Sequence, residues 1–94
     1  MEFEFDPRKS EANLQKHGID FDKAKALWLD EFALERPARS ENEVRKMLIA
    51  VHGGKLWAVI FTGRGNKVRI ISVRRAHNNE EALYEKRKNN GRKS

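Results

Sequence analysis

The first residues of the chain alternate apolar and polar positions like a short strand and then change to a helical pattern. Phe3-Glu4-Phe5 places an acidic residue between two aromatic ones, which predicts a short strand. Asp6-Pro7 follows, an N-cap carboxylate with proline at the first helical position. Gly18 suits the left-handed C-cap of a helix. We therefore expect a helix that runs through residues 9–16 and ends at Gly18.

A second helix is predicted directly after Gly18. Asp20 is its N-cap, and Ile19 stands in the staple position before it. Apolar residues then recur at helical spacing and form one stripe, which we interpret as core: Phe21, Ala24, Leu27 and Trp28. The tight connection at Gly18 predicts that the two helices form a hairpin.

From Phe32 onward the pattern changes to the period of β-strands. Residues 32–35 predict a short strand and residues 37–43 a polar loop. Gly53-Gly54 is typical of a two-residue hairpin turn, and a second turn is predicted at 63–66. These turns connect three predicted strands of an antiparallel meander: 44–52, 55–62 and 67–73 or 67–74. Because the middle strand is apolar on both faces, we expect it to be central in its sheet.

The last predicted element is a helix. Asn78 or Asn79 caps it, and two glutamates, Glu80 and Glu81, occupy the first turn, where the helix dipole favours carboxylates. Asn89-Asn90-Gly91 is expected to end it. The element order is then β-α-α-β-β-β-β-α, which predicts an α+β fold with a mostly antiparallel sheet.

Length and composition narrow the class of protein. The chain has 94 residues, enough for one domain, which we place at 1–88 with a frayed basic tail at 89–94. There is no cysteine, which excludes a disulfide framework, a thiol nucleophile and a cysteine-ligated metal. No apolar run approaches the roughly 18 residues that span a bilayer, and the first residues are acidic where a signal peptide is basic. We expect a soluble, cytoplasmic protein.

Positive charge is concentrated in the last third of the chain. The net charge is +6, from 20 Lys and Arg against 14 Asp and Glu. Residues 64–94 hold 10 bases and 3 acids, a net charge of +7, so they carry more than the whole excess. Five of these bases precede the tail and lie in or beside an apolar strand: Arg64, Lys67, Arg69, Arg74 and Arg75. Arginine on a rigid sheet suits bidentate phosphate contacts, so nucleic acid is the leading hypothesis for a partner.

These arginines are the first candidate site residues. Strand alternation predicts Arg69 and Arg75 on one face of the strand and Arg74 on the other. Arg64, between two glycines, is predicted at the tip of a turn. Arg64, Arg69 and one of Arg74 or Arg75 then converge on a phosphate. The alternative is that they are rim arginines with buried stems and solvated heads.

Candidates for proton transfer come from two helices. Lys16 and His17 end the first predicted helix, where a cation also suits the negative end of the dipole. Glu80 and Tyr84, four positions apart, share a face of the last helix, so a carboxylate beside a phenol is available for acid–base work. The alternative is a structural role for the pair, in which Glu80 matches the helix dipole and Tyr84 packs on the sheet. The three histidines lack the spacing of a metal site.

Two separated motifs together resemble one family, the BrnT toxins. The opening motif is Phe3-Glu4-Phe5-Asp6, Lys9, Asn13, Lys16-His17-Gly18-Ile19 and Phe21. The closing motif is Phe61-Thr62, Arg64-Gly65, Arg69-Ile70-Ile71-Ser72, Arg74, Ala76, Glu80 and Tyr84. The resemblance covers nearly the whole chain except the tail, and the joint occurrence of the motifs is much more specific than either one.

The resemblance implies a RelE-like fold, in which a helical hairpin and a C-terminal helix pack on a twisted antiparallel sheet. It implies a type II toxin that degrades RNA and is neutralised by a BrnA-like antitoxin with a ribbon-helix-helix fold, through which alone it reaches operator DNA. By the same analogy the active surface holds Arg64, Arg69 and Arg74, with Lys67 and Arg75 binding RNA. The weaker catalytic candidates are Lys16, His17, Glu80 and Tyr84.

RNA cleavage without a metal or cofactor fits this composition. In that mechanism the 2′-hydroxyl attacks the adjacent phosphate and leaves a 2′,3′-cyclic phosphate and a 5′-hydroxyl. The enzyme must stabilise extra charge on the phosphate, which arginines can do, and move two protons. DNA lacks the 2′-hydroxyl and is spared. The alternative function is a non-enzymatic nucleic-acid-binding or protein-interaction module, because affinity for phosphate serves both.

Overall fold

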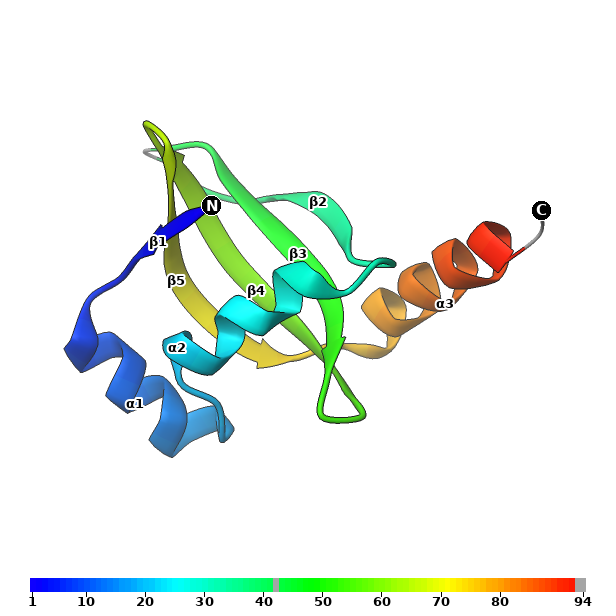
Figure 1. Cartoon of the computed structure of the whole chain (residues 1–94), viewed down its shortest axis with the longest axis horizontal. Coiled ribbons are helices and arrows are strands. Elements are labelled where there is room, and N and C mark those ends of the chain that lie inside the picture. The colour runs from blue at the N-terminus through cyan, green and yellow to red at the C-terminus, as the bar shows by residue number, and fades with distance from the viewer. Residues whose placement is uncertain (42, 93–94) are drawn as a thin grey trace.

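The structure is a computed structural model that describes residues 1–41 and 43–92 (Figure 1). Over these residues it has the predicted α+β architecture, with a five-stranded sheet and three helices. In chain order the elements are β1 (Glu2–Glu4), α1 (Pro7–His17), α2 (Phe21–Ala24), the 3₁₀-helix η1 (Lys25–Leu29), β2 (Leu34–Ala38), β3 (Arg45–His52), β4 (Lys55–Arg64), β5 (Lys67–Arg75) and α3 (Asn78–Arg92). No helix in the described ranges is both long and apolar enough to cross a bilayer.

The strands are arranged in the order β1-β5-β4-β3-β2. All neighbours are antiparallel except β1 and β5, which pair in parallel. The predicted meander of β3, β4 and β5 is confirmed, and β4 is the central strand. Its hairpin with β3 turns at Gly53-Gly54, whose φ angles of 61° and 75° suit the two-residue turn predicted there.

The predicted ends of the first two helices are confirmed. The Asp6 carboxylate accepts a hydrogen bond from the Arg8 N–H at the start of α1, and Gly18 caps the other end with a φ of 81°. Asp20 caps α2 in the same way, accepting from the Lys23 N–H. Three residues of the predicted apolar stripe, Phe21, Ala24 and Leu27, are buried and Trp28 is partly buried, although the chain changes from α-helix to 3₁₀-helix at Lys25.

The helical hairpin is fastened to the sheet by a buried asparagine. The side-chain amide of Asn13 donates to the Ile19 carbonyl oxygen at 2.8 Å and accepts from the Val73 N–H at 3.2 Å. One bond ties α1 to the connection before α2, and the other ties it to β5. Because β1 pairs only with residues 67–69, the contact at Val73 satisfies an edge of β5 that β1 does not reach.

The hydrophobic core fills the space between this helical layer and one face of the sheet, called here the helix-covered face. Its members come from both layers: Ile19, Phe21, Ala24, Leu27, Leu48, Ala50, Trp57, Val59, Phe61, Ile70 and Val73. Edge-to-face ring contacts extend it toward β1, with Phe3 against Trp28 and Phe5 against Phe21. Burial of this apolar layer determines which face of each strand is turned toward the helices.

A register irregularity in β5 overturns the predicted faces of its arginines. Ile60 of β4 lies opposite Ser72 and Phe61 lies opposite Ile70, which leaves Ile71 as an extra residue. Ile70 and Val73, three positions apart, therefore both enter the core. Strict alternation would have placed them on opposite faces.

The prediction that Arg69 and Arg75 share a face was wrong for this reason. Arg69 shares a face with Arg74, turned away from the core, whereas Arg75 lies on the helix-covered face opposite Trp57.

Three predicted boundaries also shift. The strand expected at 32–35 is β2, Leu34–Ala38, so the first residues of the expected polar loop are in a strand. The last helix begins at Asn78, which makes His77 the residue before it. That helix does not end at Asn89-Asn90-Gly91 but continues to Arg92, and the rest of the predicted tail lies outside the described residues. The domain limits at 88 stay a prediction, as does the RelE-like arrangement.

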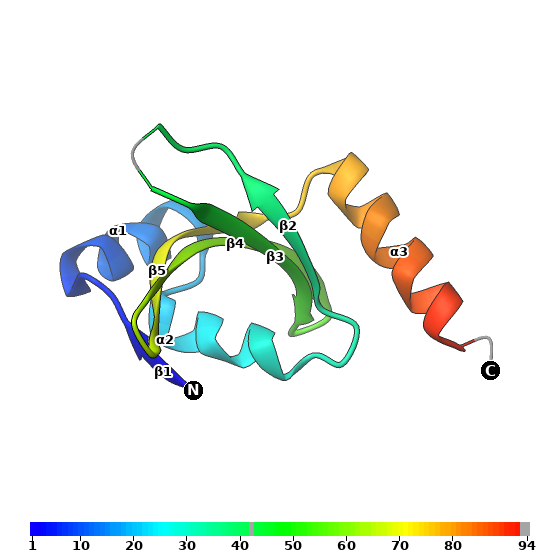
Figure 2. The same ribbon diagram turned by 90° about the horizontal axis from the view of Figure 1, so that it is seen from above.

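Helix α3 stands apart from the helical hairpin. Figures 1 and 2 show α1 and α3 at opposite ends of the molecule, with the sheet between them. The contacts of α3 are with the side of the sheet that carries Arg74, and with the segment between η1 and β2. The open remainder of that side is where the candidate site lies.

Candidate functional site

The side of the sheet opposite the helix-covered face is rich in cations. Cross-strand pairing places six of them there, and we call this surface the arginine face: Arg36, Arg45, Arg64, Lys67, Arg69 and Arg74. Four of these cations are predicted site residues: Arg64, Lys67, Arg69 and Arg74. The other two, Arg36 of β2 and Arg45 of β3, were not predicted from the sequence. They were missed because only the register of β2 on β3 shows which way residues 36 and 45 point.

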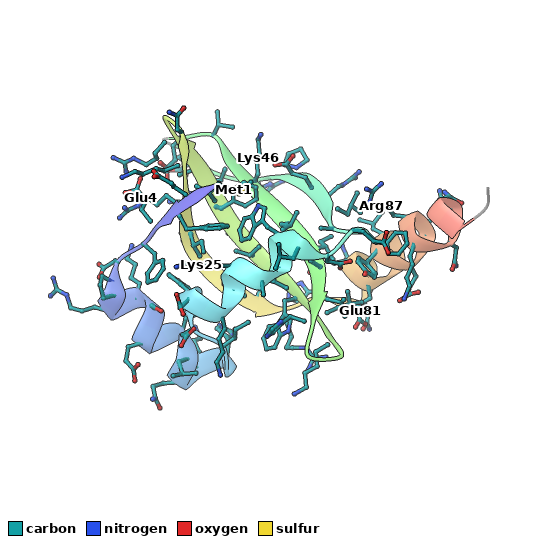
Figure 3. All side chains as sticks on the ribbon, viewed as in Figure 1. Met1, Glu4, Lys25, Lys46, Glu81 and Arg87 are labelled. Carbon is teal, nitrogen blue, oxygen red and sulfur yellow. The ribbon has the colours of Figure 1, made fainter. Side chains whose placement is uncertain are left out.

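Two predicted site residues, Arg64 and Arg69, converge on one carboxylate. The Arg64 Nε lies 4.0 Å from Oε1 of Glu4, and the Arg69 Nη1 lies 3.4 Å from Oε2 of the same residue. Parallel pairing of β1 with β5 sets Glu4 directly beside Arg69, and Figure 3 shows Glu4 near the end of the sheet where β4 turns into β5. The Arg64 side chain is 56% exposed, so this cluster is open to solvent. An anionic group is therefore already held between two guanidinium groups.

The turn around Arg64 differs from the one predicted. Arg64 is the last residue of β4 and pairs with Lys67, so the tip of the hairpin consists of Gly65 and Asn66. Only Gly65 of the two flanking glycines has a positive φ, 61°. Arg64 thus projects from a strand end beside Lys67, which adds a third cation to the cluster of Arg64 and Arg69.

Arg74 belongs to a different cluster, with Glu80 as its partner. Its Nη1 and Nη2 lie 2.7 Å and 2.9 Å from the two carboxylate oxygens of Glu80, whose side chain is only 6% exposed. Glu80 also accepts from the His77 N–H at 2.7 Å, which is the glutamate half of a capping box at the start of α3. The hydrogen bonds from Arg74 hold the pKa of Glu80 below its ordinary value and outweigh the effect of burial. The pKa of Arg74 is raised by the same pairing.

The two clusters are separate, because Arg69 is paired with Glu4 and Arg74 with Glu80. Arg69 and Arg74 are five residues apart on β5, about 15 Å at the usual rise of a strand. Arg75 lies on the other face, where its guanidinium packs 5.5 Å from the Trp57 ring centroid and its Nε donates to the Leu56 carbonyl oxygen. Of the predicted set, the structure brings only Arg64 and Arg69 together, on the Glu4 carboxylate, and their convergence on a phosphate stays a prediction.

Lys16 and His17 lie at the end of α1, one turn beyond Asn13 and beside the outer edge of β5. Within the described ranges, no hydrogen bond or ion pair connects either side chain with the arginine face. The same part of the chain contains no group of three His, Asp or Glu side chains placed to hold a metal ion.

Tyr84, the last predicted catalytic residue, donates to a carboxylate that the sequence did not single out. Its hydroxyl lies 2.8 Å from Oδ2 of Asp30, which also accepts from the Val51 and Phe32 N–H groups. Burial raises the pKa of Asp30, but these three hydrogen bonds outweigh it and hold the pKa below its ordinary value. Tyr84 and Glu80 share a helix face as predicted, yet they hold α3 to different segments. Glu80 binds Arg74 of β5, and Tyr84 binds Asp30, which lies between η1 and β2.

The arrangement can bind phosphate at two places along one sheet face. Guanidinium groups hold phosphate oxygens through paired hydrogen bonds, and the first cluster presents two of them at an exposed sheet end. The second cluster is already neutralised by Glu80 and is only about a quarter exposed at Arg74. The open cluster of Arg64, Lys67 and Arg69 is therefore the stronger candidate for binding a nucleic-acid backbone.

Comparison with known proteins identifies the family. The model of the family described as "Ribonuclease toxin, BrnT, of type II toxin-antitoxin system" matches residues 5–80. The match includes the helical hairpin, the strands β2 to β5 and Glu80, and it ends before most of α3. A comparison with curated proteins found no significant match. Because the family match covers well over half of the chain, this protein belongs to the BrnT family of ribonuclease toxins of type II toxin-antitoxin systems.

Proposed function

We propose that this toxin cleaves RNA without a metal ion and that the open cluster stabilises the reacting phosphate. The observation that carries the proposal is the convergence of Arg64 and Arg69 on the Glu4 carboxylate. A carboxylate and a phosphate present similar oxygen pairs to a guanidinium group. An RNA phosphate in place of Glu4 would meet the same two arginines, with Lys67 beside it.

The chemistry follows from the charge that develops in the reaction. Attack of the ribose 2′-hydroxyl on its own phosphate forms the new P–O bond, and the bond to the 5′-oxygen of the next nucleotide breaks. The phosphate gains negative charge on the way, and fixed guanidinium groups stabilise that charge without reorganising. One proton leaves the 2′-hydroxyl and one is added to the departing 5′-oxygen.

Fewer residues remain as candidates for the proton transfers than the sequence offered. Glu80 is held ionised by Arg74, and Tyr84 is committed to Asp30, so both have fastening contacts that compete with proton transfer. Lys16 and His17 have no such competing side-chain contact among the described residues. They lie beyond Asn13, which contacts Val73, four residues along β5 from Arg69, and no contact of the described residues brings them to the open cluster. We therefore propose Lys16 and His17 as contacts for RNA at the outer edge of β5, and we assign neither proton transfer to a residue.

The test is cleavage of two oligoribonucleotides that differ in one ribose. One has a 2′-hydroxyl at the cleaved position and the other a 2′-hydrogen, and both are incubated with purified toxin in EDTA. We expect cleavage of the first alone, with a 2′,3′-cyclic phosphate and a 5′-hydroxyl as product ends. Cleavage of both substrates, or activity that returns only when a divalent ion is added, would contradict the mechanism.

A matched pair of variants then assigns the cluster. Arg69→Ala should bind and cleave RNA weakly, while Lys55→Ala, an exposed cation at the far hairpin, should behave as the parent does. RNA that is bound in a salt-dependent way but never cut would favour the non-enzymatic module instead.

We further propose that the antitoxin is BrnA-like, with a ribbon-helix-helix fold, and that it covers the arginine face. An acidic segment on that surface would occupy the position of the RNA backbone, which accounts for inhibition by occlusion. Operator DNA would then be contacted by the antitoxin alone. A purified complex should bind RNA much more weakly than free toxin does, and protection mapping should place residues 64–75 in the interface. Contacts that avoid these residues would leave distortion of the site as the means of inhibition.

A further inference from the structure

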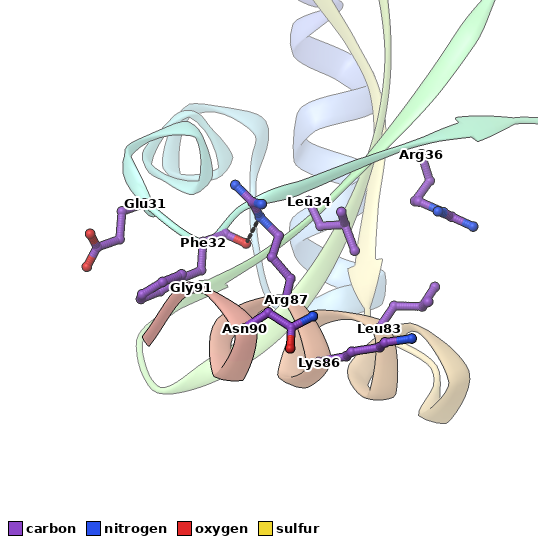
Figure 4. Close-up of a pocket in the computed structure, with 9 residues that line it drawn as sticks. All are labelled: Glu31, Phe32, Leu34, Arg36, Leu83, Lys86, Arg87, Asn90 and Gly91. Atoms are coloured by element: carbon purple, nitrogen blue, oxygen red, sulfur yellow. Dashed lines mark hydrogen bonds between the residues drawn. The ribbon is translucent and has the colours of Figure 1, made fainter. Parts of the chain in front are cut away.

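A hollow of about 590 Å³ opens between β2 and α3, and its α3 wall lies beyond the end of the family match. Figure 4 shows it from the side of α3. Its walls are Glu31, Phe32, Leu34 and Arg36 on one side, and Leu83, Lys86, Arg87, Asn90 and Gly91 of α3 on the other. The hollow is a wide, open depression and not an enclosed cavity, so it suits a group that stays partly exposed to solvent.

The hollow is continuous with the arginine face. The Arg74 Nη2 lies 3.9 Å from the sulfur of Met47, and Met47 is the cross-strand partner of Arg36. Arg74, Met47 and Arg36 therefore follow one another across the same side of the sheet, and Arg36 also lines the hollow. A strand of RNA that crosses the arginine face from Arg69 toward β2 arrives at this opening.

The wall nearest α3 is held in place by specific contacts. The Arg87 Nε donates to the carbonyl oxygens of Phe32 and Ala33, both at 3.2 Å, as drawn in part in Figure 4. A Cβ atom at Gly91 would lie 2.9 Å from Cε1 of Phe32, so glycine allows the helix to approach that ring. Gly91 of α3 therefore lies against one edge of the Phe32 ring, at the margin of the hollow.

The lining combines apolar surface with positive charge. Phe32, Leu34 and Leu83 supply the apolar part, and the three cations are Arg36, Lys86 and Arg87. Glu31 is the single acidic residue among the lining residues, and in Figure 4 its carboxylate points away from the hollow. Single-stranded nucleic acids are bound by this combination, in which a base stacks on an aromatic ring while cations follow the backbone.

We infer that the hollow binds one unpaired base of the RNA strand whose phosphate is cleaved. This inference rests on the proposed RNA path over the arginine face. Phe32 stacks on the base, and Arg36 and Lys86 hold the phosphates on either side of it. The side-chain amide of Asn90 has one acceptor and two donors for the edge of the base. The toxin therefore selects single-stranded RNA with an extruded base at this position.

An acidic amphipathic peptide would also meet apolar and cationic groups here. Two observations favour RNA. The hollow continues a surface of six cations that faces one way, and the family acts on RNA. The peptide is kept as an outcome of the test.

The test uses two labelled oligouridine probes, one complete and one that lacks a single base but retains its ribose and phosphate. Phe32→Leu keeps an apolar side chain and removes the stacking ring, and Phe5→Leu on the other side of the sheet is its matched control. Phe32→Leu should weaken binding of the complete probe about tenfold and leave the abasic probe unchanged. Arg36→Ala should weaken both probes and lower the salt slope by about one, whereas Lys55→Ala should do neither. Thermal melting of each variant shows whether it is folded.

Each outcome decides between the two proposals. If Arg69→Ala weakens binding but Phe32→Leu treats both probes alike, the base site is wrong and the proposed function stands. If Arg69→Ala also has no effect, the proposed RNA path itself is wrong. If Phe32→Leu leaves RNA binding intact but weakens the toxin–antitoxin complex, the hollow binds a peptide and our inference is overturned. Should Phe32→Leu unfold, Asn90→Ala gives the same comparison, because Asn90 is exposed and is assigned to the base edge, whereas Lys86→Ala should weaken both probes alike.

Discussion

Arg74 and Glu80 form a two-pronged ion pair that joins the end of β5 to the first turn of α3, at 2.7 Å and 2.9 Å. The same carboxylate receives the His77 N–H, so one buried side chain fixes both the strand end and the start of the helix. Glu80 therefore sets the position of α3, and through α3 it sets the width of the hollow that the helix shares with β2.

Replacing Glu80 with glutamine should destabilise the protein by about 2 kcal/mol, because the partly buried guanidinium group of Arg74 loses its charged partner. The pKa of Glu80 is lowered in the folded state, so its contribution is complete above the ordinary glutamate pKa of about 4.3 and is lost as pH falls below that value. The melting temperature of the parent should therefore fall toward that of Glu80→Gln as the pH is lowered from neutral to acidic. Replacing Glu85, an exposed glutamate on the same helix, with glutamine should change neither the melting temperature at neutral pH nor its dependence on pH. Equal melting of Glu80→Gln and the parent at neutral pH would contradict the role given to this pair.

The Tyr84→Phe variant distinguishes a structural role of the Tyr84 hydroxyl from a catalytic one. Loss of the hydroxyl bond to the Asp30 carboxylate should lower the free energy of unfolding by about 1.5 kcal/mol. RNA cleavage by the folded fraction should be nearly unchanged, because the hydroxyl is directed at Asp30. A large fall in cleavage rate with unaltered melting would instead make Tyr84 catalytic.

Arg64→Ala should affect the reaction far more than the fold. The side chain is more than half exposed and its ion pair to Glu4 is long, so the free energy of unfolding should change by no more than about 0.5 kcal/mol. Loss of a donor to the reacting phosphate should cost on the order of 10²-fold in rate. Arg64→Lys should restore activity only in part, since a point charge lacks the guanidinium geometry. Full toxicity of Arg64→Ala in cells without antitoxin would move the site to Arg69 and Lys67.

Glu4→Gln should raise the affinity for RNA. The Glu4 carboxylate competes with phosphate for Arg64 and Arg69, and its removal leaves both guanidinium groups free for the backbone. Glu2→Gln is the control, because it removes the same charge from the same face without breaking an ion pair of the described residues. An equal gain from both variants, measured by anisotropy, would point to overall charge as the cause.

Local signals in the sequence predicted the local structure well. Asp6, Gly18 and Asp20 set the helix ends through contacts within a few residues, and Gly53-Gly54 set the β3–β4 turn. The family resemblance, based on two separated motifs, is confirmed by the family match.

Features that depend on distant partners were not predictable in the same way. Glu4 reaches Arg69 only because β1 pairs in parallel with β5, 65 residues away in the chain. Asp30 was overlooked because its three donors come from a loop, a strand and α3. Helix α3 passes its predicted stop because Gly91 packs against Phe32, a contact that helix propensity does not include.

The extra residue in β5 is what allows Ile70 and Val73, three positions apart, to face the same side of the sheet. A deletion of Ile71 would leave these two residues two positions apart, and ordinary alternation would then keep Val73 in the core and Arg74 on the arginine face. The deletion would remove the local bend of the strand and bring Arg74 one residue closer to Arg69. The bulge therefore sets the spacing between the two arginine clusters, while the alternation of the strand alone would keep both on one face.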